Sequence, residues 1–160
     1  MKLRCWRDVQ GRRAGDRLRT AFALFALILA LAAAGTAAAA SPQFNYILHC
    51  QGCHLADGGA TPGKIPPLIG TGRFLAVQGG REFLVRVPGV SLSIIPDDEL
   101  AKLMNWFLYR FSADDMPADF EPYTADEVGR YRQEPLVEVE AVRVGLLGAY
   151  EDTPESAGQP

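Results

Sequence analysis

One stretch of five residues, Cys50-Gln51-Gly52-Cys53-His54, constrains this chain more than any other. It has the pattern Cys-x-x-Cys-His, at which haem is attached covalently. Two thiols three positions apart on one turn can reach both vinyl groups of a porphyrin and form thioethers. The histidine that follows then lies under the ring with its imidazole toward the iron. The motif therefore predicts thioether anchors at Cys50 and Cys53, a proximal iron ligand at His54, and a fold built around haem c.

Two other chemistries use closely spaced cysteines. A thioredoxin-like redox pair needs a βαβ context, whereas helix and loop patterns surround this pair. A tetrahedral zinc site needs four ligands, and the chain beyond residue 40 offers two cysteines and two histidines, with His49 beside Cys50. Three of these four ligands would crowd into one turn. Covalent haem attachment is the better interpretation, and these two alternatives stay open beside it.

The charge of the chain changes sharply along its length. Residues 1–20 hold seven basic and two acidic groups, whereas residues 41–160 hold nine basic and 17 acidic groups, a formal charge of −8. A surface this acidic repels nucleic acid backbones, which excludes DNA and RNA as partners. It suits a redox partner with a basic docking patch.

The first 40 residues read as an export signal. A basic segment precedes AFALFALILALAAAGTAAAA, 20 residues without a charge, and Ala38-Ala39-Ala40 satisfies the A-x-A cleavage rule. We expect residues 1–40 to be a signal peptide cleaved before Ser41, and the protein to be periplasmic. The alternative is an uncleaved membrane anchor, because 20 apolar residues can span a bilayer. Beyond this segment the only cysteines are Cys50 and Cys53, too few for a disulfide framework.

Helical periodicity dominates the rest of the chain. Phe44, Ile47 and Leu48 recur at i, i+3 and i+4, which predicts a short amphipathic helix running into Cys50. The longest helix is expected over 97–111, capped by Asp97, with an apolar face of Leu100, Leu103, Met104, Phe107, Leu108 and Phe111.

Weaker signals fill the remaining segments. Residues 55–72 are rich in glycine and proline and indicate a loop that packs on something apolar, and 79–87 favours a short helix. Thr124 and Glu127 form a capping box that opens a helix near 125–133. Residues 136–149 fit either a strand or a helix, and we favour the helix. The polar residues 151–160 are expected to be a disordered tail.

Over residues 42–111 the chain resembles the class I c-type cytochromes. The resemblance includes the attachment motif, the aromatic Phe44 before it, the segment Pro66-Pro67-Leu68, and a last helix whose Trp106 and Phe107 would meet the first helix. It implies a small all-α domain wrapping one haem. It also implies that the backbone carbonyl of Pro66 accepts the free ring N–H of His54, and that Leu68 and Ile69 cover the haem.

The distal iron ligand departs from the family pattern. Relatives carry a methionine in the loop before the last core helix, but residues 87–95 contain no methionine, histidine or lysine. Met116 is the leading candidate, since it precedes a proline and its separation from Cys53 lies in the family's usual range. Met104 fits a core filler better, Lys64 a solvated side chain, and His49 lies on the attachment side.

The sequence therefore predicts four segments: a signal peptide over 1–40, a cytochrome core over 41–112, an extension over 113–150 that packs on the core, and the tail. We expect no enzymatic activity of its own, but a one-electron carrier or an electron-accepting subunit. Its partner would be a dehydrogenase, an oxidase or another cytochrome, and it would contact a membrane only if residues 21–40 stay uncleaved. One alternative is a haem sensor or gas-binding protein with an open distal iron site; another is a module without haem.

Overall fold

The computed structural model describes residues 19, 22–26, 39–63, 65–153 and 156. By its internal contacts the chain divides into the units Met1–Ala38 and Ala39–Pro160. Most of the expected signal peptide, Lys64 and most of the expected tail lie outside the described residues, and cleavage before Ser41 stays a prediction. Within the described residues, no helix is long and apolar enough to cross a bilayer.

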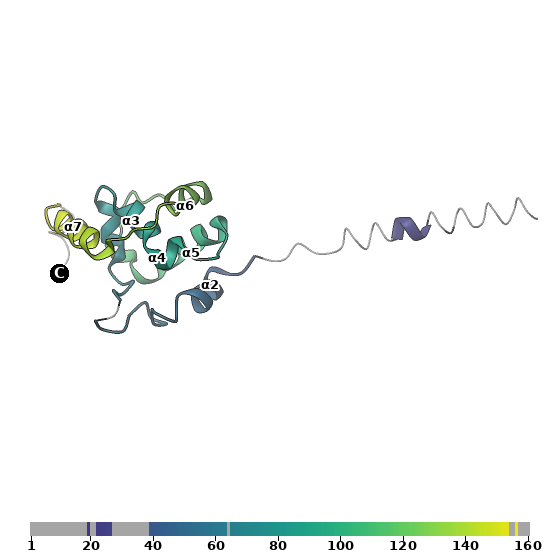
Figure 1. The fold of residues 1–160 in the computed structure, drawn as a ribbon, viewed down its shortest axis with the longest axis horizontal. Helices are drawn as coiled ribbons and strands as arrows, with labels where there is room; N and C mark the ends of the chain where they lie inside the picture. The colour runs from purple at the N-terminus through teal and green to yellow at the C-terminus, as the bar shows by residue number, and fades with distance from the viewer. Residues whose placement is uncertain (1–18, 20–21, 27–38, 64, 154–155, 157–160) are drawn as a thin grey trace, which may run out of the picture. The chain divides into compact units, whose positions relative to one another are not determined.

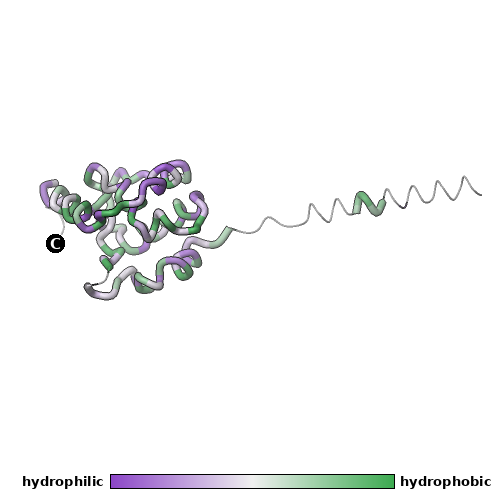
Figure 2. Tube along the Cα trace, viewed as in Figure 1, coloured by the Kyte–Doolittle hydropathy of each residue, from purple (hydrophilic) through white to green (hydrophobic). Residues whose placement is uncertain are grey.

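The unit from Ala39 onward is all-α (Figure 1), as the sequence predicts. Every regular element that the structure describes in it is helical, in the order α2 (Pro42–His49), η1 (Thr71–Ala76), α3 (Gly80–Arg86), α4 (Pro88–Ser91), α5 (Asp97–Phe111), η2 (Ala113–Asp115), α6 (Ala125–Tyr131) and α7 (Val139–Glu151). Hydrophobic and hydrophilic residues mix along these helices in Figure 2, as expected where each helix covers a shared core with one face.

Helix α5 supplies more buried residues to that core than any other described helix. Five residues of the predicted apolar face, Leu100, Leu103, Met104, Phe107 and Leu108, are buried, the sixth, Phe111, is half-buried, and the bounds of the helix match the predicted range 97–111. Its cap does not. Pro96 is the N-cap and no side chain caps the helix; the Asp97 carboxylate instead accepts a hydrogen bond from Arg132 Nη1 at 2.8 Å. The predicted Asp97 cap is therefore wrong, because an arginine distant in sequence takes the carboxylate.

Helix α2 packs on α5 with a face that periodicity did not select. Tyr46 is 1% exposed and its ring lies 5.4 Å from that of Trp106, whereas Phe44 is 55% exposed. Trp106 thus meets the first helix as predicted, but through Tyr46 rather than Phe44. The stripe of Phe44, Ile47 and Leu48 faces away from the core, since all three are exposed.

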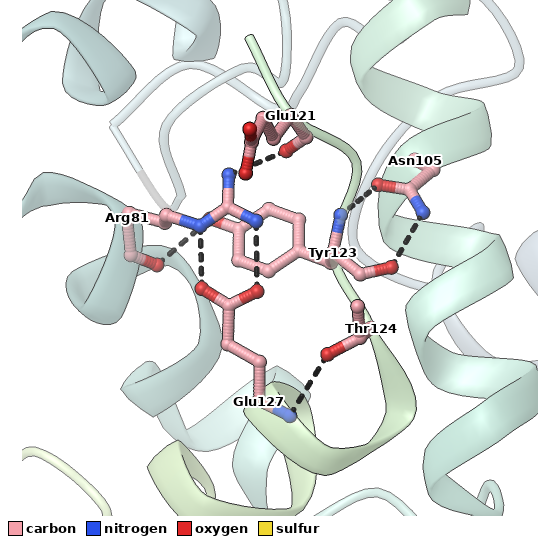
Figure 3. Close-up of polar contacts among 6 residues, drawn as sticks. All are labelled: Arg81, Asn105, Glu121, Tyr123, Thr124 and Glu127. Carbon is pink, nitrogen blue, oxygen red and sulfur yellow. Dashed lines mark hydrogen bonds and ion pairs between the residues drawn. The ribbon is translucent and has the colours of Figure 1, made fainter.

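The segment after α5 folds back over α3 and α5. Thr124 Oγ1 accepts from Glu127 N at 3.2 Å and starts α6, which confirms the predicted cap. Figure 3 shows how α6 is tied down: the Arg81 guanidinium of α3 lies between the Glu127 carboxylate and the Tyr123 ring, 4.1 Å from that ring's centroid. The Asn105 side chain bonds the Tyr123 backbone in both directions, at 2.8 and 3.0 Å.

Helix α7 completes the unit by packing on η1 and α3. The preceding segment is anchored by a hydrogen bond of 2.9 Å from Leu136 N to the Arg86 carbonyl. The predictions of a helix rather than a strand here, and of a short helix near 79–87, are both confirmed. The division of this unit into a core and an extension at residue 112 stays a prediction.

Candidate functional site

A pocket of about 330 Å³ opens beside the attachment motif. The turn after α2 contributes Cys50, Cys53 and His54, and the proline segment contributes Pro66 and Leu68, so the predicted anchoring residues gather at one site. The remaining walls are mostly apolar and come from five helices: Phe74 of η1, Phe83 and Leu84 of α3, Gly89 and Val90 of α4, Phe107 of α5 and Val139 of α7. A volume of this size and an apolar lining suit a flat, largely apolar cofactor.

The attachment turn is a direct continuation of α2. The Ser41 side chain caps that helix by accepting from Phe44 N at 3.2 Å, with Pro42 in its first turn. At the other end, Cys53 N and His54 N both donate to the Cys50 carbonyl, at 3.0 and 2.9 Å. This closed turn brings Cys50, Cys53 and His54 to the lining of the same pocket.

Two contacts hold the loop after His54 against the helices. The Tyr46 hydroxyl donates to the Leu55 carbonyl at 2.5 Å, which joins α2 to the residue next to His54. Gly58 has a φ of +81°, and a Cβ at this position would lie 2.6 Å from the Phe111 ring. Only glycine therefore lets the loop turn this close to α5. Neither Tyr46 nor Gly58 was singled out from the sequence, although Asp57-Gly58 is a recognisable turn signal.

His54 has the properties that an iron ligand needs. Burial lowers its pKa below the ordinary value of 6.5, so the imidazole is neutral and keeps a lone pair near pH 7. Its Nδ1 is buried and has no hydrogen-bond partner among the described residues. Pro66 lines the same pocket, and the predicted bond from this ring to the Pro66 carbonyl stays a prediction.

Two arginines also reach the pocket, and neither was expected there from the sequence. Arg73 of η1 donates from Nε to the Gly70 carbonyl at 3.0 Å, and Arg143 lies on α7 one turn after Val139. Haem carries two carboxylates, and guanidinium groups bind carboxylates well. The one sequence signal that could have placed Arg143 in the pocket is its i, i+4 spacing from Val139, which puts both residues on one helix face. Nothing local marks Arg73.

Neither candidate methionine lines the pocket. Met116 follows η2 and packs against the core, outside the residues that line the pocket. Met104 is 1% exposed within α5, in agreement with its expected role as a core filler, and is also outside the lining. His49 lines the pocket but is exposed on α2 beside Cys50. Lys64 lies outside the described residues, and ligation by Met116 stays a prediction.

These features fit haem better than the other chemistries of the motif. Each feature corresponds to one part of a haem. The apolar pocket suits the ring, the two thiols suit the vinyl groups, the neutral imidazole suits the iron, and the two arginines suit the carboxylates. Across the described residues, no three or more His, Cys, Asp or Glu side chains are placed to hold a metal ion, which gives the zinc interpretation no support. All-helical surroundings give the thioredoxin interpretation none either.

Comparison with characterised proteins points the same way. No protein-family model matches the chain. It is 31% identical over 121 residues to a cytochrome c-552 of Thermus thermophilus, which covers 64% of this chain and 82% of the relative. A second cytochrome c-552 of Thermus thermophilus is 32% identical over 106 residues, covering 54% of this chain and 81% of the relative. The chain belongs to the c-type cytochromes. As a c-type cytochrome it holds haem c and carries electrons, and the residues predicted to anchor the haem line the pocket beside Cys50–His54.

Proposed function

We propose that this c-type cytochrome carries one haem, bound covalently through Cys50 and Cys53 and ligated by His54, and works in the periplasm as a one-electron carrier or electron-accepting subunit. The observation that carries the proposal is the convergence of both thiols and the neutral imidazole on one apolar pocket. When bound, haem c supplies a one-electron iron couple.

The residues of this chain hold and shield that group. Cys50 and Cys53 fix its edge to the turn after α2, and His54 orients the iron. Arg73 and Arg143 are placed to pair with the carboxylates, which would otherwise be desolvated charges at an apolar wall. Phe74, Phe83 and Phe107 exclude water from the ring, and a dry surrounding changes the reduction potential through the local dielectric.

The partner is expected to be another redox protein. The formal charge of −8 over residues 41–160 favours a dehydrogenase, oxidase or cytochrome with a basic docking surface. The electrostatic contribution to such docking is screened by salt, so the rate of electron transfer should fall as ionic strength rises.

A haem-stained denaturing gel and the reduced optical spectrum test the proposal. The protein is made in cells able to mature c-type cytochromes, together with the variants Cys50→Ala and Cys53→Ala. The matched control is Gln43→Ala, because Gln43 is exposed on α2 and lies outside the pocket lining.

We expect a stained band at the position of the chain for the parent and for Gln43→Ala, because a thioether survives denaturation. Cys50→Ala and Cys53→Ala each remove one anchor and should give little or no stained product. An unstained parent chain, made beside a c-type cytochrome that does stain, would contradict the proposal.

A further inference from the structure

Among the described residues, the pocket holds no side chain that could ligate iron from the side away from His54. Outside the turn His49–His54, the described lining residues include no methionine, histidine, lysine, cysteine or acidic side chain. Thr71 is the one hydroxyl among them, and it donates to the Leu68 carbonyl at 2.7 Å. The guanidinium groups of Arg73 and Arg143 stay protonated and do not ligate metals.

Met116 is held on another side of η1. Gly72 N donates to Ser112 Oγ at 2.7 Å in a buried bond, and a Cβ on Gly72 would lie 2.8–2.9 Å from backbone atoms of Ser112, Asp115 and Met116. Thr71 and Arg73 line the pocket, but Gly72 does not. The segment with Met116 therefore packs against a part of η1 that faces away from the pocket, and η1 would have to move before this sulfur could reach it.

The short loop before α5 is fixed as well. The Arg132 guanidinium donates to the carbonyls of Ser91 at 3.1 Å and Ile95 at 2.8 Å, and also bonds Ser93. This loop joins α4, whose Gly89 and Val90 line the pocket, to α5. One partly buried cation thus holds the apolar wall of the pocket in place and leaves that loop little freedom to rearrange.

We propose that the described residues of this apolar pocket give the haem iron no distal ligand, and that the pocket binds small neutral diatomic molecules, CO or NO, at the reduced iron. Phe83, Leu84, Val87 and Val90 form its apolar wall. Distal polarity and access decide what a haem iron binds, and this lining favours uncharged ligands over charged ones. The inference rests on the haem attachment proposed above and adds coordination of an external ligand.

The test uses the purified full chain with its haem. After reduction we expect a five-coordinate, high-spin spectrum and a rapid shift of the Soret band when CO is added. The oxidised protein should lack the near-infrared band of methionine-ligated haem. Met116→Ala and Lys64→Ala should leave the spectrum and the CO response unchanged, because under this inference, in contrast to the prediction from the sequence, neither side chain ligates the iron.

The variant Val90→Met tests the reverse change, the addition of a methionine ligand to the pocket. It places a thioether on the wall of the pocket, so we expect a near-infrared methionine band and loss of the CO response, whereas Val144→Met on the exposed side of α7 should change neither.

A six-coordinate parent spectrum with no CO response would overturn the inference. Loss of that spectrum in Met116→Ala or Lys64→Ala would then identify the ligand. Such a result leaves the proposed carrier function intact, whereas a chain without haem overturns both proposals, so the two failures are distinguishable.

Discussion

The two thiols of the attachment turn lie in different surroundings, although only two residues separate them. Cys53 is exposed, whereas Cys50 is partly buried against the core. Burial, with a smaller contribution from neighbouring Cys53, raises the pKa of Cys50 to about 11. Because the thiolate is the reactive form, Cys50 depends on its surroundings for reactivity.

Alkylation of the chain made without haem should follow this difference. At pH 8 a thiol of pKa about 11 is ionised in only about one molecule in a thousand, so iodoacetamide should modify Cys53 well before Cys50. The Cys50 rate should rise as the pH is raised toward 11. Peptide mass spectrometry measures both rates, and urea-unfolded chain serves as the control in which they converge. Equal rates in the folded chain would contradict the assigned burial of Cys50.

Gly72 offers a second test at the residue scale. Gly72→Ala places a Cβ against backbone atoms that cannot rotate away, so we expect a loss of about 1–3 kcal/mol in the free energy of unfolding. Gly148→Ala is the control, because no atom lies within 4 Å of its Cβ and alanine favours a helix. Urea unfolding of both variants gives the comparison, and an unchanged midpoint for Gly72→Ala would show that η1 does not pack on the Ser112–Met116 segment.

At the scale of helices, α6 is joined to distant segments by arginine contacts as well as by its buried Val128. Arg132, just after α6, bonds the loop before α5, and Glu127 within α6 pairs with Arg81 of α3. The sequence predicted this helix from its cap but not its contacts. A capping box is a local signal, whereas the partners of Arg132 are 35 to 41 residues away in the chain.

Replacing Arg132 measures how much its hydrogen bonds to the loop before α5 stabilise the fold. Arg132→Met keeps an apolar stem but leaves the carbonyls of Ser91, Ser93 and Ile95 without their donor, so we expect the free energy of unfolding to fall by about 2–4 kcal/mol. Arg130→Met, at an exposed position within α6, should change the free energy of unfolding by less than about 0.5 kcal/mol. Equal unfolding midpoints for the two variants would contradict the role given to Arg132.

The fate of the sequence predictions also differs between helices. The bounds of α5 were predicted because its apolar residues repeat over four turns. The buried face of α2 was not, because over eight residues Phe44 and Tyr46 are equally good anchors by periodicity. Which of the two is buried depends on Trp106 and Phe111, whose rings lie 5.4 and 5.3 Å from the Tyr46 ring. Arg73 of the pocket was missed for the same reason, since only the fold brings it there, and the spacing of Arg143 from Val139 points to the pocket only once Val139 is known to line it.

At the scale of the whole molecule, one pocket draws on both ends of the folded unit. The anchors come from the turn after α2, and Val139 and Arg143 come from α7, nearly 90 residues later in the chain. The sequence identified the anchors because their chemistry is encoded in five consecutive residues. It could not show that the last helix closes the site, because that depends on how α7 packs on η1 and α3.

Removing α7 tests this closure. A chain that ends at residue 137 loses Val139 and Arg143 and exposes the haem to water, which stabilises the more highly charged oxidised form. We expect its reduction potential to fall relative to the full chain. A chain ending at residue 153 keeps α7 and should retain the parent potential. Spectroelectrochemical titration measures all three, and an unchanged potential in the shorter chain would show that α7 does not shield the haem.

The most direct test of the account is the intact mass of the exported protein, measured after denaturation. A chain joined to haem through Cys50 and Cys53 should have the mass of the polypeptide plus one haem, with neither thiol open to alkylation. A colourless product with the mass of the bare polypeptide, from cells that attach haem to a control cytochrome, would contradict it.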